Sequence, residues 1–140
     1  MRDKHRITVF YIEMLLLVAV FTGVIMVLSG VFATAKEQSS EARALNGAVR
    51  LAENAAEIVA GTDDHSEMVD LLGGDNSAAC HLELKKLLAR YNSDMEPDPD
   101  GGFLVVVAWE EKDGLVNYYI TVTWQDGEPV YKLETSVFYE

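Results

Sequence analysis

Carboxylates are the side chains in this sequence whose spacing comes closest to a recognisable chemistry. Glu96, Asp98 and Asp100 alternate with prolines and are followed by Gly101. Oxygen ligands at alternate positions with a glycine after them are typical of the beginning of a calcium-binding loop. The twelfth position of an EF-hand is a glutamate, but here it is Val107. We therefore interpret the segment as a solvated turn, with a calcium site as the alternative.

The other reactive residue types form no pattern that predicts catalysis. His65 and His81 have no cysteine or histidine partners at zinc-ligand spacing. The serines lie in no nucleophile-elbow motif, and the sequence has no glycine-rich phosphate loop. Trp109 and Trp124 could belong to a ligand platform, but aromatic residues in strands more often form core and cross-strand pairs. We expect no catalytic residue, no cofactor and no enzymatic activity.

One carboxylate, Glu13, lies inside the most apolar stretch of the chain, residues 9–35. From Met14 to Ala35 there are 22 residues without a formal charge. As a helix they would extend roughly 33 Å, about the hydrocarbon thickness of a bilayer, and we interpret residues 9–35 as a transmembrane helix. A lone carboxylate costs about 2.5–3.5 kcal/mol at the bilayer centre and less near the interface. Glu13 is therefore either solvated at the level of the headgroups or paired with a positive group.

Charge is distributed very unevenly along the chain. Residues 1–6 carry a net charge of +2, whereas residues 36–140 contain 8 basic and 21 acidic side chains, a net charge of −13. The positive-inside rule therefore predicts a cytoplasmic N-terminus and an acidic domain outside the cell membrane. A domain this acidic is not expected to bind nucleic acid. The alternative is a secretory signal peptide cleaved after Ala33-Thr34-Ala35, which would release a soluble secreted domain.

The helical pattern continues beyond the apolar stretch. Residues 36–61 contain no proline, and their apolar residues, including Leu45, Val49 and Ala52, recur at helical spacing beside a polar side. Gly61 then ends the pattern. The simplest interpretation is a single continuous helix from about Val9 to Ala60.

The sequence thus predicts four successive segments. They are a short basic cytoplasmic leader (1–8), a transmembrane helix (9–35), its amphipathic continuation (36–61) and an extracytoplasmic α+β domain (62–140). The last segment begins with a connection, residues 62–76, that holds a short helix with Asp64 or Ser66 as its cap. A second helix is predicted from about Ser77 to Arg90, and we expect its cysteine, Cys80, to be buried.

Three segments near the C-terminus predict strands. Phe103–Glu110, Leu115–Trp124 and Pro129–Tyr139 are rich in β-branched and aromatic residues. Asp113-Gly114 and Asp126-Gly127 separate them and are strong hairpin signals. So small a meander is marginal by itself, and we expect the long helix to cover it. The predicted fold is α+β: a long N-terminal helix, transmembrane in its first half and amphipathic in its second, packed on a three-stranded antiparallel meander.

The N-terminal residues resemble those of the type IV pilin-like proteins, which include pilins and the pseudopilins of type II secretion and competence systems. The resemblance lies in the basic leader MRDKHRIT, in Phe10-Tyr-Ile-Glu13 followed by MLLLVAV, and in the segment Ala42 to Val59, which is similar to the outer half of many pseudopilin helices. It implies that Glu13 matches the family's glutamate in the fifth mature position, which pairs with the N-terminal amine of a neighbouring subunit. Val9 would then be the first mature residue, and Thr8 stands where the family has glycine.

The resemblance implies a structural minor subunit of a pilus or pseudopilus that assembles through its N-terminal helix. Its partners would be the membrane, other pilin- or pseudopilin-like subunits and the prepilin peptidase. A chain that is retained uncleaved, or a degenerate minor subunit, would account for Thr8. The alternative from another class is a single-pass anchored sensor or binding module, which needs no assembly through Glu13 and predicts a small-ligand pocket in the outer domain.

Overall fold

The computed structural model describes residues 2–138, and the chain divides into two compact units between Glu41 and Ala42. Helix α1 (Arg2–Gly61) is uninterrupted and contributes to both units. The long N-terminal helix predicted from Val9 to Ala60 is therefore present and begins earlier than expected. We call residues 42–138 the sheet domain and describe it separately from the N-terminal part of α1.

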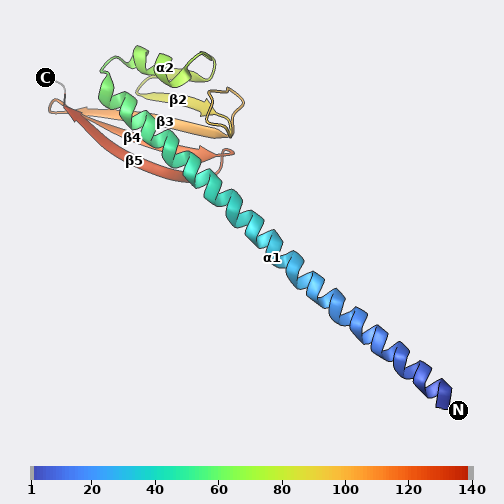
Figure 1. Cartoon of the computed structure of the whole chain (residues 1–140). Coiled ribbons are helices and arrows are strands. Elements are labelled where there is room, and N and C mark those ends of the chain that lie inside the picture. Colours follow the sequence, from blue (N-terminus) through green and yellow to red (C-terminus); the bar gives the residue numbers. More distant parts are fainter. Residues whose placement is uncertain (1, 139–140) are drawn as a thin grey trace. The chain divides into compact units, whose positions relative to one another are not determined.

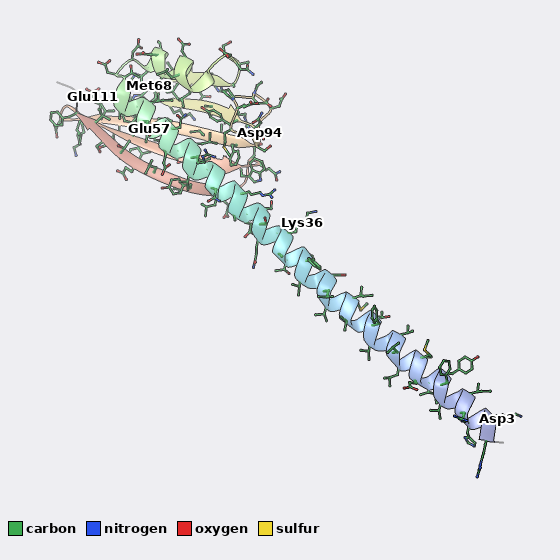
Figure 2. All side chains as sticks on the ribbon, viewed as in Figure 1. Asp3, Lys36, Glu57, Met68, Asp94 and Glu111 are labelled. Carbon is green, nitrogen blue, oxygen red and sulfur yellow. The ribbon has the colours of Figure 1, made fainter. Side chains whose placement is uncertain are left out.

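Between Ile7 and Ala35, α1 is apolar on every side apart from Glu13. Its large apolar side chains between Ile7 and Phe32 are each 46–74% exposed, and Figure 2 shows them projecting all around the helix between Asp3 and Lys36. Averaged over its whole length α1 is only weakly apolar, because its beginning and its second half are polar. One window of it is nevertheless long and apolar enough to cross a membrane, a property that a signal sequence near an N-terminus shares.

The sheet domain contains one antiparallel sheet of five strands in the order β1-β2-β3-β4-β5 (Figure 1). Its strands are β1 (Cys80–Glu83), β2 (Lys86–Tyr91), β3 (Phe103–Lys112), β4 (Leu115–Trp124) and β5 (Pro129–Phe138). The three predicted strands correspond to β3, β4 and β5, with Tyr139 outside the described residues. The prediction of a three-stranded sheet was wrong, because two more strands precede them.

The two additional strands replace the helix that was predicted from Ser77 to Arg90. β1 and β2 form a hairpin, and β2 pairs with β3 so that Leu87 lies opposite Val107 and Ala89 opposite Val105. All four of these side chains are at most 1% exposed. Pairing with the apolar centre of the sheet outweighs the helix propensity of the leucine and lysine residues in this segment.

The hairpin between β3 and β4 has the turn that its sequence predicts. Asp113 and Gly114 both have positive φ, 55° and 80°, and they join the paired residues Lys112 and Leu115. Two central residues with positive φ define a type I′ turn, which matches the twist of the flanking strands. The connection from β4 to β5 is longer, and the register shifts between Val122 and Thr123.

The core of the sheet domain lies between the sheet and two helical segments. The face of α1 that packs on the sheet is made of small and medium residues: Gly47, Ala48, Leu51, Ala52, Ala55 and Val59. Leu45, which the sequence placed on this face, is instead 45% exposed. Figure 1 shows this end of α1 running across the sheet. Gly47 permits the close approach, since a Cβ there would lie 2.8 Å from Cζ of Phe103.

Helix α2 (His65–Gly73) packs beside β1 and β2. Its predicted cap is confirmed, because the Asp64 side chain accepts a hydrogen bond from the Ser66 backbone N–H at 2.9 Å. Leu72 is 2% exposed in the core. The hydroxyl of Tyr91 on β2 donates a 2.7 Å hydrogen bond to the carbonyl of Leu72, which ties the helix to the sheet.

Candidate assembly site on helix α1

Glu13 lies on the exposed apolar part of α1 without a partner of its own. His5, Arg6, Val9 and Phe10 line a shallow hollow on the helix surface beside it. Within residues 2–138, Glu13 makes no hydrogen bond and no ion pair. Arg6 is seven residues earlier, about 10 Å along the helix axis, and it forms no ion pair with Glu13. The described residues therefore leave this carboxylate without a compensating charge.

An unpaired carboxylate in an apolar stretch can bind a positively charged group. In lipid its desolvation is unfavourable, so a positively charged group from another molecule gains both a hydrogen bond and charge neutralisation by reaching it. The hollow at Glu13 is open, and its apolar walls (Val9 and Phe10) would lower the local dielectric around such a pair. The site can therefore recognise a cationic group, but its residues include no nucleophile with an adjacent base.

The Thr8–Val9 bond, which the resemblance marks as the cleavage point, lies inside α1. The Thr8 hydroxyl donates a 2.8 Å hydrogen bond to the carbonyl of Lys4. Thr22 and Thr34 make the same contact with the residues four positions earlier, at 2.8 and 3.1 Å. The helix backbone thus satisfies the hydrogen-bonding capacity of all three hydroxyls. A peptidase would have to unwind the first turns of α1 before it could cut at Thr8.

The loop with the calcium-like spacing is closed by its own hydrogen bonds. The Asp98 side chain accepts from the backbone N–H of Asp100 at 2.9 Å, and the carbonyl of Asp98 accepts from Gly101 at 2.9 Å. The backbone N–H of Glu96 donates to the Asn92 side chain at 3.0 Å. Among residues 2–138, no group of three or more histidine, cysteine, aspartate or glutamate side chains is placed to hold a metal. The three carboxylates therefore do not converge.

The histidines lie apart from each other and belong to different surroundings. His65 begins α2 and stacks on Trp109, with ring centroids 4.1 Å apart and an interplanar angle of 13°. His81 is exposed on β1, 3.7 Å from the Glu83 carboxylate. Trp124 packs on Phe103 with centroids 4.4 Å apart. Trp109 and Trp124 thus pack against the core of the sheet domain, as aromatic residues in strands commonly do.

Two titratable side chains in the sheet domain are held in their neutral forms. Cys80 is a free cysteine and 3% exposed, as predicted, and burial raises the pKa of its thiol to about 11. Burial, and secondarily the neighbouring Cys80, raises the pKa of Tyr91 well above its ordinary value. A thiol with a raised pKa is a poor nucleophile, so Cys80 acts as a small core residue.

A polar hollow in the sheet domain bears on the binding-module alternative. It measures about 370 Å³ and lies between α1 and the segment after β2, with Arg50 and Asn54 on the helix and Asp94 and Met95 opposite. It is open to solvent and mainly polar, whereas ligand pockets are typically enclosed and apolar. This geometry gives no specific support to a small-ligand site.

The sequence patterns did not single out Gly47, although it is important for the packing of α1. The structure places it on the buried face of α1, against Phe103 and Met95. Its neighbour Ala48 is fully buried as well. The signal was present in the sequence: small residues, and not the large Leu45, mark the side of a helix that approaches a sheet most closely.

Comparisons with known proteins do not identify the chain. No protein-family model, no curated protein and no solved structure matches it. The resemblance to the pilin-like proteins therefore rests on the residues quoted above.

Proposed function

We propose that this protein is a non-enzymatic structural subunit, similar to a minor pilin or pseudopilin, of a type IV pilus-related machine for secretion, competence or adhesion. The observation that carries the proposal is the position of Glu13. It is a single carboxylate at the beginning of an apolar helix segment that nothing in residues 2–138 covers. A helix that is apolar on all sides needs either lipid or other helices around it.

The proposed mechanism is assembly in the plane of the membrane. Residues 9–35 of α1 would lie in the bilayer, with the basic N-terminal residues in the cytoplasm and the acidic domain outside. Neighbouring subunits would pack against this segment, and one of them would supply the cation for Glu13. Because a charge pair in lipid forms only at one relative height of the two helices, the pair would fix the axial register of the subunits.

The source of that cation depends on whether the leader is removed. Cleavage at Thr8–Val9 would create a new amine at Val9, and a neighbouring subunit's amine could then reach Glu13. Without cleavage, a neighbouring chain's Arg6 or Lys4 is the available positive group. The glycine that the family has before the cut is replaced by Thr8, so we propose that the leader is retained.

The test is crosslinking in native membranes, followed by affinity capture of the chain and mass spectrometry. We expect recovery of other pilin-like subunits together with an N-terminal peptide that continues through Thr8 and Val9. A peptide that begins at Val9 would overturn the retained leader but leave the assembly intact. Recovery of the chain alone, uncleaved, would contradict the assembly and favour an anchored binding module. Recovery only from the soluble extracellular fraction, beginning after Ala35, would show that the apolar segment is a signal peptide.

A further inference from the structure

The face of the sheet that points away from the two helices, which we call the outer face, has an apolar centre. In β3, Phe103, Val105 and Val107 are at most 2% exposed in the core. Because side chains alternate along a strand, the residues between and after them point to the outer face. These residues are also apolar and partly exposed: Leu104, Val106 and Ala108. An antiparallel sheet with one face in solvent normally alternates apolar and polar residues, so the middle of β3 has the composition of a strand that is covered on both sides.

The register of the sheet extends this apolar centre onto the neighbouring strands. Val106 pairs with Leu88 of β2 and with Thr121 of β4. Ala108 pairs with Tyr119 of β4, which is 39% exposed. We define the outer patch as Leu88, Leu104, Val106, Ala108 and Tyr119. A contiguous apolar patch with a polar rim is typical of a protein interaction surface, whereas α1 and α2 both pack on the core side of the sheet.

The charges around the outer patch nearly cancel. By alternation along the strands, the charged side chains of the outer face are four basic and three acidic residues: Lys86, Arg90, Lys112, Lys132, Glu83, Glu110 and Glu134. Lys86 forms an ion pair with Glu83 at 3.2 Å, and Arg90 forms one with Asp126 at 3.0 Å. Residues 62–76 and 92–102 instead hold nine acidic side chains and no lysine or arginine. Charge in the sheet domain is therefore segregated.

This segregation of charge favours a second copy of the chain as the molecule that covers the outer patch. Residues 62–76 include α2 on the core side of the sheet, and Met95 of the loop 92–102 packs over Gly47 of α1. If two outer faces met, these acidic segments would lie on the far sides of the pair, where they repel each other least. A strongly charged partner of another kind would find little net charge to complement on the outer face.

We propose that two copies of this chain associate through their outer patches, sheet against sheet, with Val106 near a two-fold axis. Sheets that pack face to face lie about 10 Å apart, and their side chains interdigitate. The outer patch of each copy would then be buried. The interface contains neither Glu13 nor any apolar residue of the N-terminal part of α1, and it does not depend on the proposed function.

The symmetry of this pair suits two chains that are anchored in one membrane. The proposed two-fold axis lies in the plane between the two sheets and runs parallel to residues 42–61 of α1. A rotation about an axis parallel to a helix leaves the direction of that helix unchanged. Residues 42–61 of the two copies therefore run in the same direction, one on each outer side of the pair.

Charged residues at position 106 test the pairing in the full chain. Chains that carry two different C-terminal tags are co-expressed, and one tag is captured from detergent-solubilised membranes. We expect the second tag to be recovered with the unaltered chain. Roughly fivefold less should be recovered when both chains carry Val106→Asp or both carry Val106→Lys, because like charges would meet near the axis. A mixed pair of Val106→Asp and Val106→Lys chains should recover at least about threefold more than either like-charged pair.

Asn54→Asp is the matched control, because it adds the same charge on an exposed position of α1, on the other side of the sheet. It should leave the recovery unchanged. Comparable thermal unfolding would show that the sheet domain is folded in each variant. If a charged variant unfolds at a lower temperature, Val106→Thr replaces it, since it keeps the β-branched shape; the lost apolar contact should lower the recovery roughly threefold.

The same captures in Glu13→Ala chains separate this interface from assembly through α1, and the second copy should still be recovered there. Loss of the second copy in Glu13→Ala would show that the copies meet through α1 and would overturn the proposal. Absence of the second tag with the unaltered chain, or unchanged recovery with the charged variants, would also overturn it. Loss in both like-charged pairs without recovery in the mixed pair would mean that a different protein covers the outer patch, which equally contradicts a pair of copies.

Discussion

Two stretches of the same helix use apolar residues in opposite ways. Between Ile7 and Phe32 the side chains are large and 46–74% exposed. Between Gly47 and Val59 the buried face is made of small and medium residues that pack on the sheet. In residues 2–138 the first stretch is exposed, whereas the second is buried against the sheet of its own compact unit. Apolar character alone therefore does not pack a helix onto a domain, because the size of the residues on one face decides how closely the helix can approach.

The largest effect is expected from a charge in the packed stretch. Ala52 is fully buried against the sheet, so Ala52→Asp would place an unpaired carboxylate in the core. We expect it to lower the free energy of unfolding of the sheet domain by roughly 3–5 kcal/mol. Urea unfolding of the full chain in detergent, followed by tryptophan fluorescence, measures this. Asn54→Asp on the exposed side of the same turn should change it by less than about 0.5 kcal/mol. Equal effects would mean that α1 does not pack as described.

A smaller change tests the close approach of helix and sheet. Gly47→Ala adds a Cβ in close contact with Met95 and 2.8 Å from Phe103 Cζ. Overpacking of this kind costs about 1–3 kcal/mol of unfolding free energy, of which the higher helix propensity of alanine offsets up to about 1 kcal/mol, so we expect a net loss of stability. Gly23→Ala, in the exposed stretch, adds a Cβ with nothing within 4 Å. It should leave the unfolding of the sheet domain unchanged. A stabilising effect of Gly47→Ala would contradict the packing at Phe103.

The neutral side chains in the core predict a dependence on high pH. The pKa of Cys80 is raised to about 11, and that of Tyr91 is raised as well. A group whose pKa is higher in the folded state than in the unfolded state contributes its full stabilisation at pH values below its unfolded-state pKa. This stabilisation is lost as the pH rises through its folded-state pKa. The melting temperature of the sheet domain should therefore fall as the pH rises from about 9 toward 11. The fall should be smaller in Cys80→Ala, and an unchanged dependence in that variant would remove Cys80 as a cause.

The smallest effect is expected from a hydroxyl in the exposed stretch. The Thr22 hydroxyl donates a 2.8 Å hydrogen bond to the carbonyl of Val18 within α1. Thr22→Val removes only this local bond, so membrane insertion and the unfolding of the sheet domain should change by less than about 0.5 kcal/mol. Carbonate extraction of membranes and urea unfolding provide the two measurements. A large loss of partner recovery in this variant would show that Thr22 contacts another chain.

Sequence patterns predicted the parts of the fold whose signals are local and repeated. The long helix, the Asp64 cap and the Asp113-Gly114 hairpin were all readable, because each depends on periodicity or on turn chemistry within a few residues. β1 and β2 were missed since Cys80, Leu84 and Leu87 also fit a helical spacing. Their strand conformation comes from pairing with β3, which is distant in sequence.

The candidate assembly site at Glu13 could be located from the sequence, but its role could not be derived from a single chain. The apolar residues around Glu13 mark it in the sequence, and the structure places it on an exposed helix surface. Its function depends on a partner that supplies the positive charge. The position of β5 in the sheet was equally beyond prediction from the sequence. The alternation of apolar and polar residues predicted the strand, but only the strand order of the sheet shows that β5 lies at its edge.

The most direct test of the central claim compares Glu13→Ala with Glu37→Ala. Both remove one carboxylate from α1, but only Glu13 lies within the apolar stretch. In crosslinked native membranes, both variants should remain inserted, and Glu13→Ala should recover at least tenfold less of the partner subunits than the unaltered chain. Glu37→Ala should recover them normally. Unchanged recovery with Glu13→Ala would contradict assembly through this carboxylate.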